Sequence, residues 1–90
     1  MEIGAQILVR GVVQGVGFRY FVYRKATEMG IRGFVRNSGD GSVFIEAVAD
    51  RSLVEELISA VRVGPRLAHV TDVKVEWGKP ADEFRDFEIR

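Results

Sequence analysis

The stretch from Gly11 to Arg19, with the sequence GVVQGVGFR, constrains the fold of this chain more than any other. A β-branched run precedes it and an amphipathic helical pattern follows it, which predicts a turn from a strand into a helix. Its three glycines allow positive φ angles and a close approach of the backbone to a ligand. No Ser, Thr, Asp or Asn, the residues that usually cap a helix start, occurs before Tyr23. We therefore expect free backbone N–H groups at this helix end, where a bound anion would satisfy them.

The distribution of charge favours a small anion over a polyanion. The 90 residues include 13 basic and 13 acidic side chains, and this balance argues against nucleic acid or an anionic membrane as the main partner. Residues 1–37 nevertheless carry six basic and two acidic side chains, and no acid occurs from Ile3 to Thr27. The sequence thus predicts a local positive site within a neutral protein.

Length and composition predict a single domain over residues 1–90. No run is long enough to span a bilayer, and the N-terminus lacks the layout of a signal peptide. The absence of cysteine excludes disulfides, a thiolate nucleophile and a cysteine-based zinc site. No group of side chains has the spacing of a metal site, so we expect neither metal nor cofactor. The expected protein is soluble, cytoplasmic and monomeric.

Hydrophobic periodicity and turn signals predict seven elements. Their order is a strand over 5–12, a helix from the glycine turn to about Met29, strands over 33–37 and 42–49, a helix from about 52 to 63, and strands over 68–77 and 87–89. Asp50 or Ser52 is expected to cap the second helix, with Ser52 and Glu55 forming a capping box. A bulge is expected near residues 71–72, and residues 79–83 are expected to form a polar connection.

The order β-α-β-β-α-β, with an extra short strand at the end, predicts an α+β fold. We expect the ferredoxin-like split βαβ sandwich, with a sheet of mainly antiparallel pairs and both helices on one face. In this arrangement the first two strands run parallel, with the third strand between them. Because parallel strands end at the same edge, Asn37 should lie near the glycine turn despite its distance in the sequence.

Several common motifs are absent. A dinucleotide fingerprint would need glycine where this chain has Tyr20, and no Gly-Lys-Ser/Thr phosphate loop occurs. The tripeptide from Arg32 to Phe34 matches the start of an RNA-recognition signature, but the following residues break it. His69 is the only histidine, and no Ser/Asp set is spaced to serve it as a catalytic base.

Two segments closely resemble the signatures of the acylphosphatase family. Residues 9–19, VRGVVQGVGFR, resemble the first signature, and residues 33–43, GFVRNSGDGSV, resemble the second. They occur in the family's order and spacing, and the resemblance covers essentially the whole chain. One departure is Ala49, where the second signature usually closes on glycine.

This resemblance implies a metal-free hydrolase that converts an acyl phosphate to a carboxylate and inorganic phosphate. It implies that Arg19 binds the phosphoryl group and that Asn37 orients the attacking water. The expected phosphate-binding residues are Gln14, Gly15, Val16, Gly17, Phe18, Arg19 and Tyr20. The expected partners are a small-molecule acyl phosphate and inorganic phosphate, as product and inhibitor.

Two alternatives remain at this point. One is an acylphosphatase-like domain that serves carbamoyl phosphate within a hydrogenase maturation factor. The short end of the chain after the last strand, without a linker, favours a free-standing protein. The other alternative is a non-catalytic module of the same fold that binds anions or RNA, which exposed aromatic side chains on the open sheet face would support.

Overall fold

The computed structural model describes residues 1–80 and 83–90. In these residues the chain forms two helices and five strands, in the order β1 (Glu2–Val12), α1 (Phe18–Glu28), β2 (Arg32–Asn37), β3 (Val43–Asp50), α2 (Arg51–Val63), β4 (His69–Gly78) and β5 (Phe87–Ile89). The polar connection expected over 79–83 includes residues 81 and 82, which lie outside this description. Within the described residues, neither helix is both long and apolar enough to cross a membrane.

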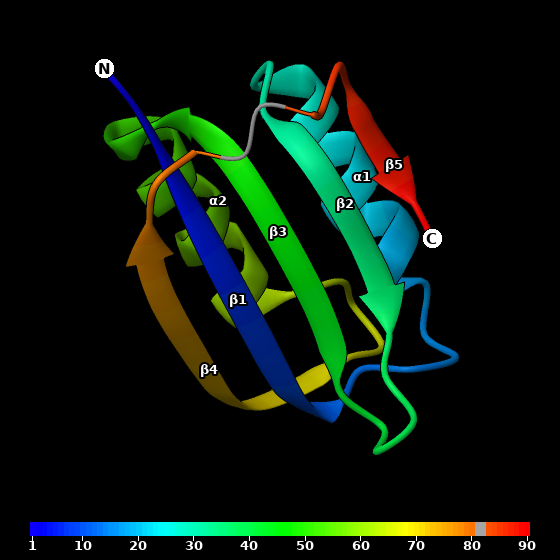
Figure 1. Cartoon of the computed structure of the whole chain (residues 1–90). Helices are drawn as coiled ribbons and strands as arrows, with labels where there is room; N and C mark the ends of the chain where they lie inside the picture. Colours follow the sequence, from blue (N-terminus) through cyan, green and yellow to red (C-terminus); the bar gives the residue numbers. More distant parts are fainter. Residues whose placement is uncertain (81–82) are drawn as a thin grey trace.

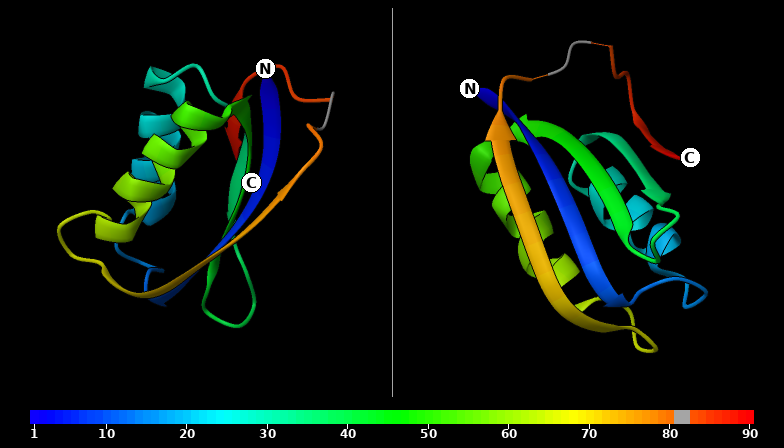
Figure 2. Two further views of the ribbon diagram at one scale, coloured as in Figure 1. Left: turned by 90° about the vertical axis from the view of Figure 1, so that its left-hand side faces the viewer. Right: turned by 60° about the horizontal axis from the view of Figure 1, so that its bottom comes forward.

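The sheet has the predicted topology. Its strand order is β4-β1-β3-β2-β5, and β3 is antiparallel to both of its neighbours, so that β1 and β2 run parallel (Figure 1). The short β5 adds a parallel pair at the edge beside β2. Both helices cover the same face of the sheet, which gives two layers (Figure 2). The predicted ferredoxin-like α+β sandwich with an added C-terminal strand is confirmed.

The core lies between the sheet and the helices. Alternate residues of the central strands point into it, and Ile7, Val9 and Ile45 are fully buried. On α1, Phe18 and Val22 are four positions apart on one face of the helix and are buried as well. Each such side chain contributes about 1.5–3 kcal/mol. A slip of β1 by one residue would turn this face to solvent, so burial fixes its register.

The first strand begins earlier than the sequence predicted. Periodicity placed its start at Ala5, whereas β1 begins at Glu2 and pairs along the whole length of β3. In this extension Ile3 lies opposite Ala49, the residue that departs from the family signature. Ala49 is buried and has no positive φ, so the strand end accommodates a side chain without strain.

The start of α2 corrects one prediction. The helix begins at Arg51 after Asp50, and no side chain makes a capping hydrogen bond there. Asp50 Oδ1 instead accepts from the amino group of Met1 at 3.0 Å, and Glu55 pairs with Arg51 at 3.5 Å. The predicted capping box is therefore wrong, because the N-cap position is Asp50, two residues before the Ser52 that the box requires.

A bulge in the β1–β4 ladder lies where the sequence placed it. Arg10 pairs with Asp72 and Gly11 with Val70, so Thr71 is the extra residue. Gly11 has a φ of 129°, and a Cβ there would lie 2.1 Å from a backbone oxygen of β4. Glycine is thus required at this close approach, immediately before the loop that leads into α1.

Candidate functional site

The loop between β1 and α1 is shaped by two left-handed glycines. Gly15 has a φ of 74° and Gly17 a φ of 78°. A Cβ at either position would meet no atom within 4 Å, so the backbone angle, and not lack of space, requires glycine. Left-handed residues within such a turn direct successive N–H groups toward a common point, which is the geometry of an anion-binding concavity.

The N-terminus of α1 adds further free donors. The first helical hydrogen bond is donated by Phe21 N–H to the carbonyl of Gly17 at 3.0 Å. The N–H groups of the three preceding residues therefore have no acceptor within the helix. No side chain caps this end, and no acid occupies the first turn. The positive end of the helix dipole is thus open to an anion, as predicted.

A hollow of about 240 Å³ lies against this helix end; we call it the loop hollow. Its lining residues are Val13, Gly15, Gly17, Phe18, Arg19, Tyr20, Asn37 and Ile89. The structure thus brings together Arg19 and Asn37, which are 18 positions apart, because β1 and β2 end at the same edge of the sheet. The prediction that Asn37 lies near the glycine turn is therefore confirmed.

The sequence did not single out Ile89 as part of the site. Ile89 ends β5, which runs parallel to β2 and places this residue opposite Val35, two positions before Asn37. The short last strand was expected, but its pairing partner was not. No motif marks it, and only the pairing of β5 with β2 would have revealed its position.

The side chains of Arg19 and Asn37, which line the loop hollow, have no polar partner of their own in the part of the chain that the structure describes. Within the described residues, the side chain of Arg19 makes no hydrogen bond or ion pair and is exposed. Asn37 Oδ1 is buried and has no hydrogen-bond partner there. A buried amide oxygen without a partner costs about 1–3 kcal/mol. Such a cost at the wall of a hollow is typical of a functional position.

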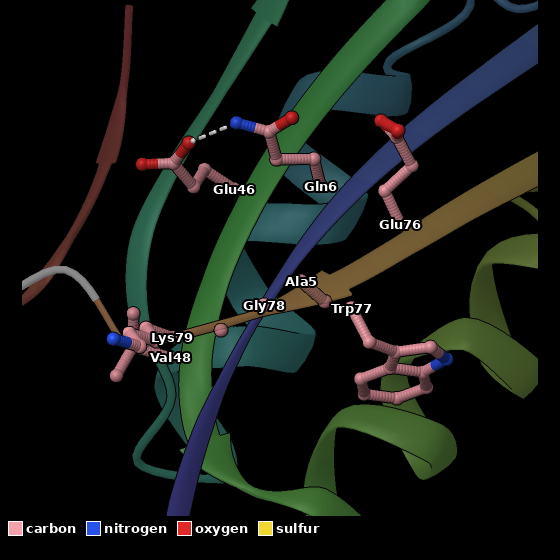
Figure 3. Close-up of a pocket in the computed structure, with 9 residues that line it drawn as sticks. Ala5, Gln6, Glu46, Val48, Glu76, Trp77, Gly78 and Lys79 are labelled. Carbon is pink, nitrogen blue, oxygen red and sulfur yellow. Dashed lines mark hydrogen bonds between the residues drawn. The ribbon is translucent and has the colours of Figure 1, made fainter.

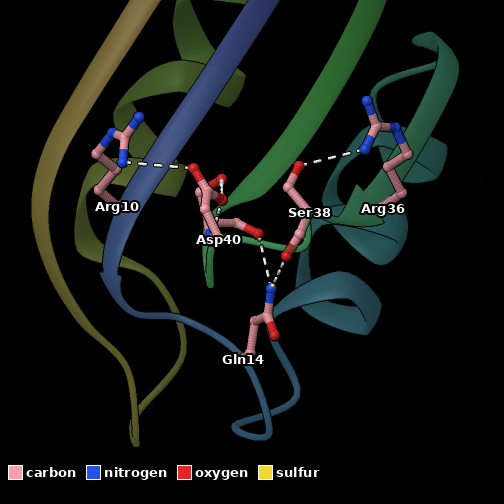
Figure 4. A network of polar contacts seen from close by, with 6 residues as sticks. Arg10, Gln14, Arg36, Ser38 and Asp40 are labelled. Carbon is pink, nitrogen blue, oxygen red and sulfur yellow. Dashed lines mark hydrogen bonds and ion pairs between the residues drawn. The ribbon is translucent and has the colours of Figure 1, made fainter.

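Gln14 points away from the loop hollow. Its Nε2 donates to the carbonyl oxygens of Ser38 at 2.8 Å and Ser42 at 2.9 Å (Figure 4). The side chain therefore joins the loop to the β2–β3 turn, directly after Asn37. Val16 also does not line the hollow, because its side chain packs against the core. For these two residues, phosphate binding stays a prediction; for Val16 the expected donor is its backbone N–H.

The β2–β3 turn is itself held by a polar network. Asp40 Oδ1 accepts from the hydroxyl of Ser42 at 2.6 Å and from its backbone N–H at 3.0 Å. These two hydrogen bonds, with a smaller contribution from Arg10 at 3.5 Å, lower the pKa of the Asp40 carboxyl (Figure 4). At neutral pH this carboxylate therefore fixes the turn in its charged form.

Another hollow, of about 390 Å³, lies at the opposite end of the sheet. Figure 3 shows Gln6, Glu46 and Glu76 on one side of it and Trp77 on the other, with Gln6 donating to Glu46 at 3.1 Å. In residues 1–80 and 83–90, no three His, Cys, Asp or Glu side chains are grouped so as to hold a metal ion. This hollow carries none of the anion-binding features of the loop hollow.

Fold and site together define a class of protein: a two-layer α+β domain with an uncapped helix N-terminus and a hollow at one edge of its sheet. The family model of acylphosphatase matches residues 5–89. The chain therefore belongs to the acylphosphatase family, whose members hydrolyse acyl phosphates.

Individual relatives agree with this assignment. The chain is 48% identical over 82 residues to an acylphosphatase of Salinibacter ruber, which covers 91% of this chain and 86% of that protein. The crystal structure of acylphosphatase from Bacillus subtilis matches at 35% identity with a TM-score of 0.94, covering 98% of both chains. Full-length HypF, in a phosphate- and nucleotide-bound form, matches at 30% identity and a TM-score of 0.87, with only 12% of that chain covered.

Proposed function

We propose that this acylphosphatase carries out its reaction at the loop hollow, without a metal ion. The observation that carries the proposal is that Arg19 and Asn37 line one hollow at the N-terminus of α1, with the side chain of Arg19 in no hydrogen bond or ion pair within the described residues. An acceptor for a water proton and a planar cation for a phosphoryl group thus share one hollow at a helix N-terminus. The catalytic pair is the one that the family resemblance implied.

The phosphoryl group would be bound by charge and by backbone donors. The N–H groups from Gly15 to Tyr20 and the end of α1 supply hydrogen bonds, and the planar fork of Arg19 can bond two phosphate oxygens at once. Phosphoryl transfer is loose, so charge stabilisation at the equatorial oxygens supplies most of the catalysis. These groups are preformed, which suits that requirement.

The chemistry of the leaving group explains why no general acid is needed. The oxygen of water bonds to phosphorus, the bond from phosphorus to the acyl oxygen breaks, and the products are a carboxylate and inorganic phosphate. A carboxylic acid has a pKa of about 4, so the carboxylate departs unprotonated at neutral pH. Asn37 orients the water but is too weak a base to deprotonate it, and a phosphate oxygen of the substrate takes the proton.

We assign Gln14 a positioning role in this reaction. Its two hydrogen bonds join the phosphate-binding loop to the turn that follows Asn37. The distance between the phosphoryl group and the water therefore depends on this link. A misplacement of about 1 Å at such a site can reduce a rate about a hundredfold.

We further propose that residues 1–90 act as one cytoplasmic, monomeric domain without a nucleic-acid partner. The zero net charge supports the last point. On the open sheet face, Phe34 and Phe44 are half-buried and lie 5.9 Å apart. The guanidinium of Arg36 lies over one ring and that of Arg90 over the other, so these rings offer bases little open surface for stacking.

The test is hydrolysis of benzoyl phosphate with and without a chelator. We expect equal turnover in both, and a loss of about a thousandfold in kcat/KM for Arg19→Ala and Asn37→Ala without unfolding. Arg62→Ala, which removes an exposed arginine of α2, should have little effect. Loss of activity with chelator would refute the metal-free reaction. Carbamoyl phosphate, tested in parallel, should be the poorer substrate; a strong preference for it would favour the carbamoyl-phosphate alternative.

A further inference from the structure

A second hollow continues from the loop hollow along α1. It has a volume of about 380 Å³, and we call it the helix hollow. Its lining residues are Gly17, Tyr20, Phe21, Arg24, Lys25, Glu28 and Pro65. It shares Gly17 and Tyr20 with the loop hollow, so a molecule bound by the loop has only these two residues to pass over to reach it.

One wall of the helix hollow is apolar. The side chain of Tyr20 lies on this wall and is 59% exposed, so its ring is open to a ligand. Its ring stacks on Tyr23, with the centroids 6.2 Å apart and an angle of 24° between the planes. Phe21 packs against the core from the same helix. Both rings are thus held in place before any ligand binds, so an apolar group could pack on them at little cost in entropy.

The charge of the helix hollow is not balanced. Arg24 pairs with Glu28 at 3.7 Å. Lys25 is half-buried, with Nζ 5.8 Å from the centre of the Phe21 ring, and it forms no ion pair with the described residues. Its neighbours along the chain back to Ile3 include no acid. An anionic group entering the hollow would therefore meet an uncompensated ammonium group.

The direction of the reaction also points to this hollow. In phosphoryl transfer the attacking and leaving oxygens lie roughly in line on opposite sides of phosphorus. Asn37, which would hold the water, lines only the loop hollow, whereas Lys25 and Pro65 line only the helix hollow. A substrate that extends across Gly17 and Tyr20 thus carries its acyl group away from the attacking water.

We propose that the helix hollow is the acyl-group subsite of this enzyme. The body of the acyl group packs on Tyr20 and Phe21, and a second anionic group of the same acyl chain binds at Lys25. The inference rests on the proposed function and deepens it. It assigns to this chain a preference for acyl phosphates whose acyl group has an apolar body and carries an anionic group of its own.

Three substrates separate these contributions: acetyl phosphate, benzoyl phosphate and 4-carboxybenzoyl phosphate. The first ratio, kcat/KM for benzoyl phosphate over that for acetyl phosphate, reports packing of the acyl group. The second ratio, kcat/KM for 4-carboxybenzoyl phosphate over that for benzoyl phosphate, reports the effect of the added carboxylate. We expect Tyr20→Ala to lower the first ratio, and Lys25→Met to lower the second by about three- to tenfold. Lys74→Met, which removes an exposed lysine from the other face of the sheet, should change neither ratio.

Each other outcome overturns a defined part of the inference. If Lys25→Met and Lys74→Met change the second ratio equally, the effect is one of overall charge and Lys25 is not part of a subsite. If neither ratio responds to any variant while acetyl phosphate is hydrolysed, the subsite is refuted and the proposed function stands. If the unmodified protein hydrolyses none of the three, the proposed function fails and the subsite fails with it.

Discussion

Replacing Gln14 with methionine tests how the phosphate-binding loop is held against the β2–β3 turn. Methionine keeps the length and most of the volume of the side chain but removes the amide that donates to Ser38 and Ser42. The site is half-buried, so methionine can remain in place without exposing a new apolar surface. The change therefore removes two hydrogen bonds and little else.

The size of the effect follows from the partners left behind. The carbonyl of Ser42 still accepts from Ser38 N–H at 2.8 Å, and that of Ser38 still accepts from Gly41 N–H at 3.2 Å. Neither oxygen is orphaned, so the loss is the net value of two hydrogen bonds, each about 1 kcal/mol. We expect the free energy of unfolding to fall by about 1–2 kcal/mol. This corresponds to about a five- to thirtyfold change in the folding equilibrium.

Two measurements assign the role of Gln14. Urea unfolding gives the loss of stability, and kinetics with benzoyl phosphate separate kcat from the inhibition constant of inorganic phosphate. If Gln14 positions the turn that follows Asn37, kcat should fall about tenfold while phosphate inhibits almost as before. Gln6→Met is the matched control, because Gln6 makes a single exposed hydrogen bond on the open sheet face. It should change stability by less than about 0.5 kcal/mol and leave kcat unchanged.

The result that refutes positioning is equally specific. A variant that loses stability but keeps its kcat would show that the link is structural alone. A large increase in the inhibition constant of phosphate, with kcat preserved, would instead support the prediction from the sequence that Gln14 binds phosphate itself.

Three further predictions concern stability. Asp40→Asn should be less stable than the unmodified protein at pH 7 and should approach it at pH 3. The hydrogen bonds from Ser42 lower the pKa of Asp40 in the folded state, so the unfolded state binds more protons and this stabilisation is lost as pH falls. If the free energies of unfolding of the two proteins change in parallel with pH, this reasoning is refuted. Gly33→Ala should lose more than about 2 kcal/mol in urea unfolding, because its Cβ would lie 1.8 Å from the carbonyl of Glu46, whereas Gly39→Ala, with no atom within 4 Å, should lose under about 0.5 kcal/mol. Inorganic phosphate at 100 times its dissociation constant should stabilise the protein by about 2.7 kcal/mol; an unchanged melting temperature would contradict an anion site.

Periodicity was sufficient for the elements of this fold and for their order. The alternation of Ile7 and Val9 is visible within one segment, and so is the helical spacing of Phe18 and Val22. Each pattern arises because its segment buries a single face. The ends of the strands and helices were harder to predict. The early start of β1 depends on its pairing with the end of β3, and this partner cannot be seen from β1 alone.

The candidate site likewise has one part that the sequence predicted and another that it did not. The meeting of Arg19 and Asn37 followed from topology, since two parallel strands end at one edge. The position of Ile89 and the hydrogen bonds of Gln14 did not, because each depends on a pairing or side-chain direction that no local pattern contains. The sequence identified Gln14 as part of the loop but gave no indication of the direction of its amide.

The missing cap of α1 has less meaning alone than the sequence suggested. The second helix also begins without a side-chain cap. What distinguishes α1 is the combination of open N–H groups with left-handed glycines at 15 and 17, an uncommitted Arg19 and a buried oxygen of Asn37. An unsatisfied helix end is common, whereas free backbone donors, a guanidinium and an amide side chain that line one hollow suit an anion and a water together. The amide of Asn37 in the same hollow, rather than the donors of α1, is therefore the feature that suits the proposed hydrolysis and not anion binding alone.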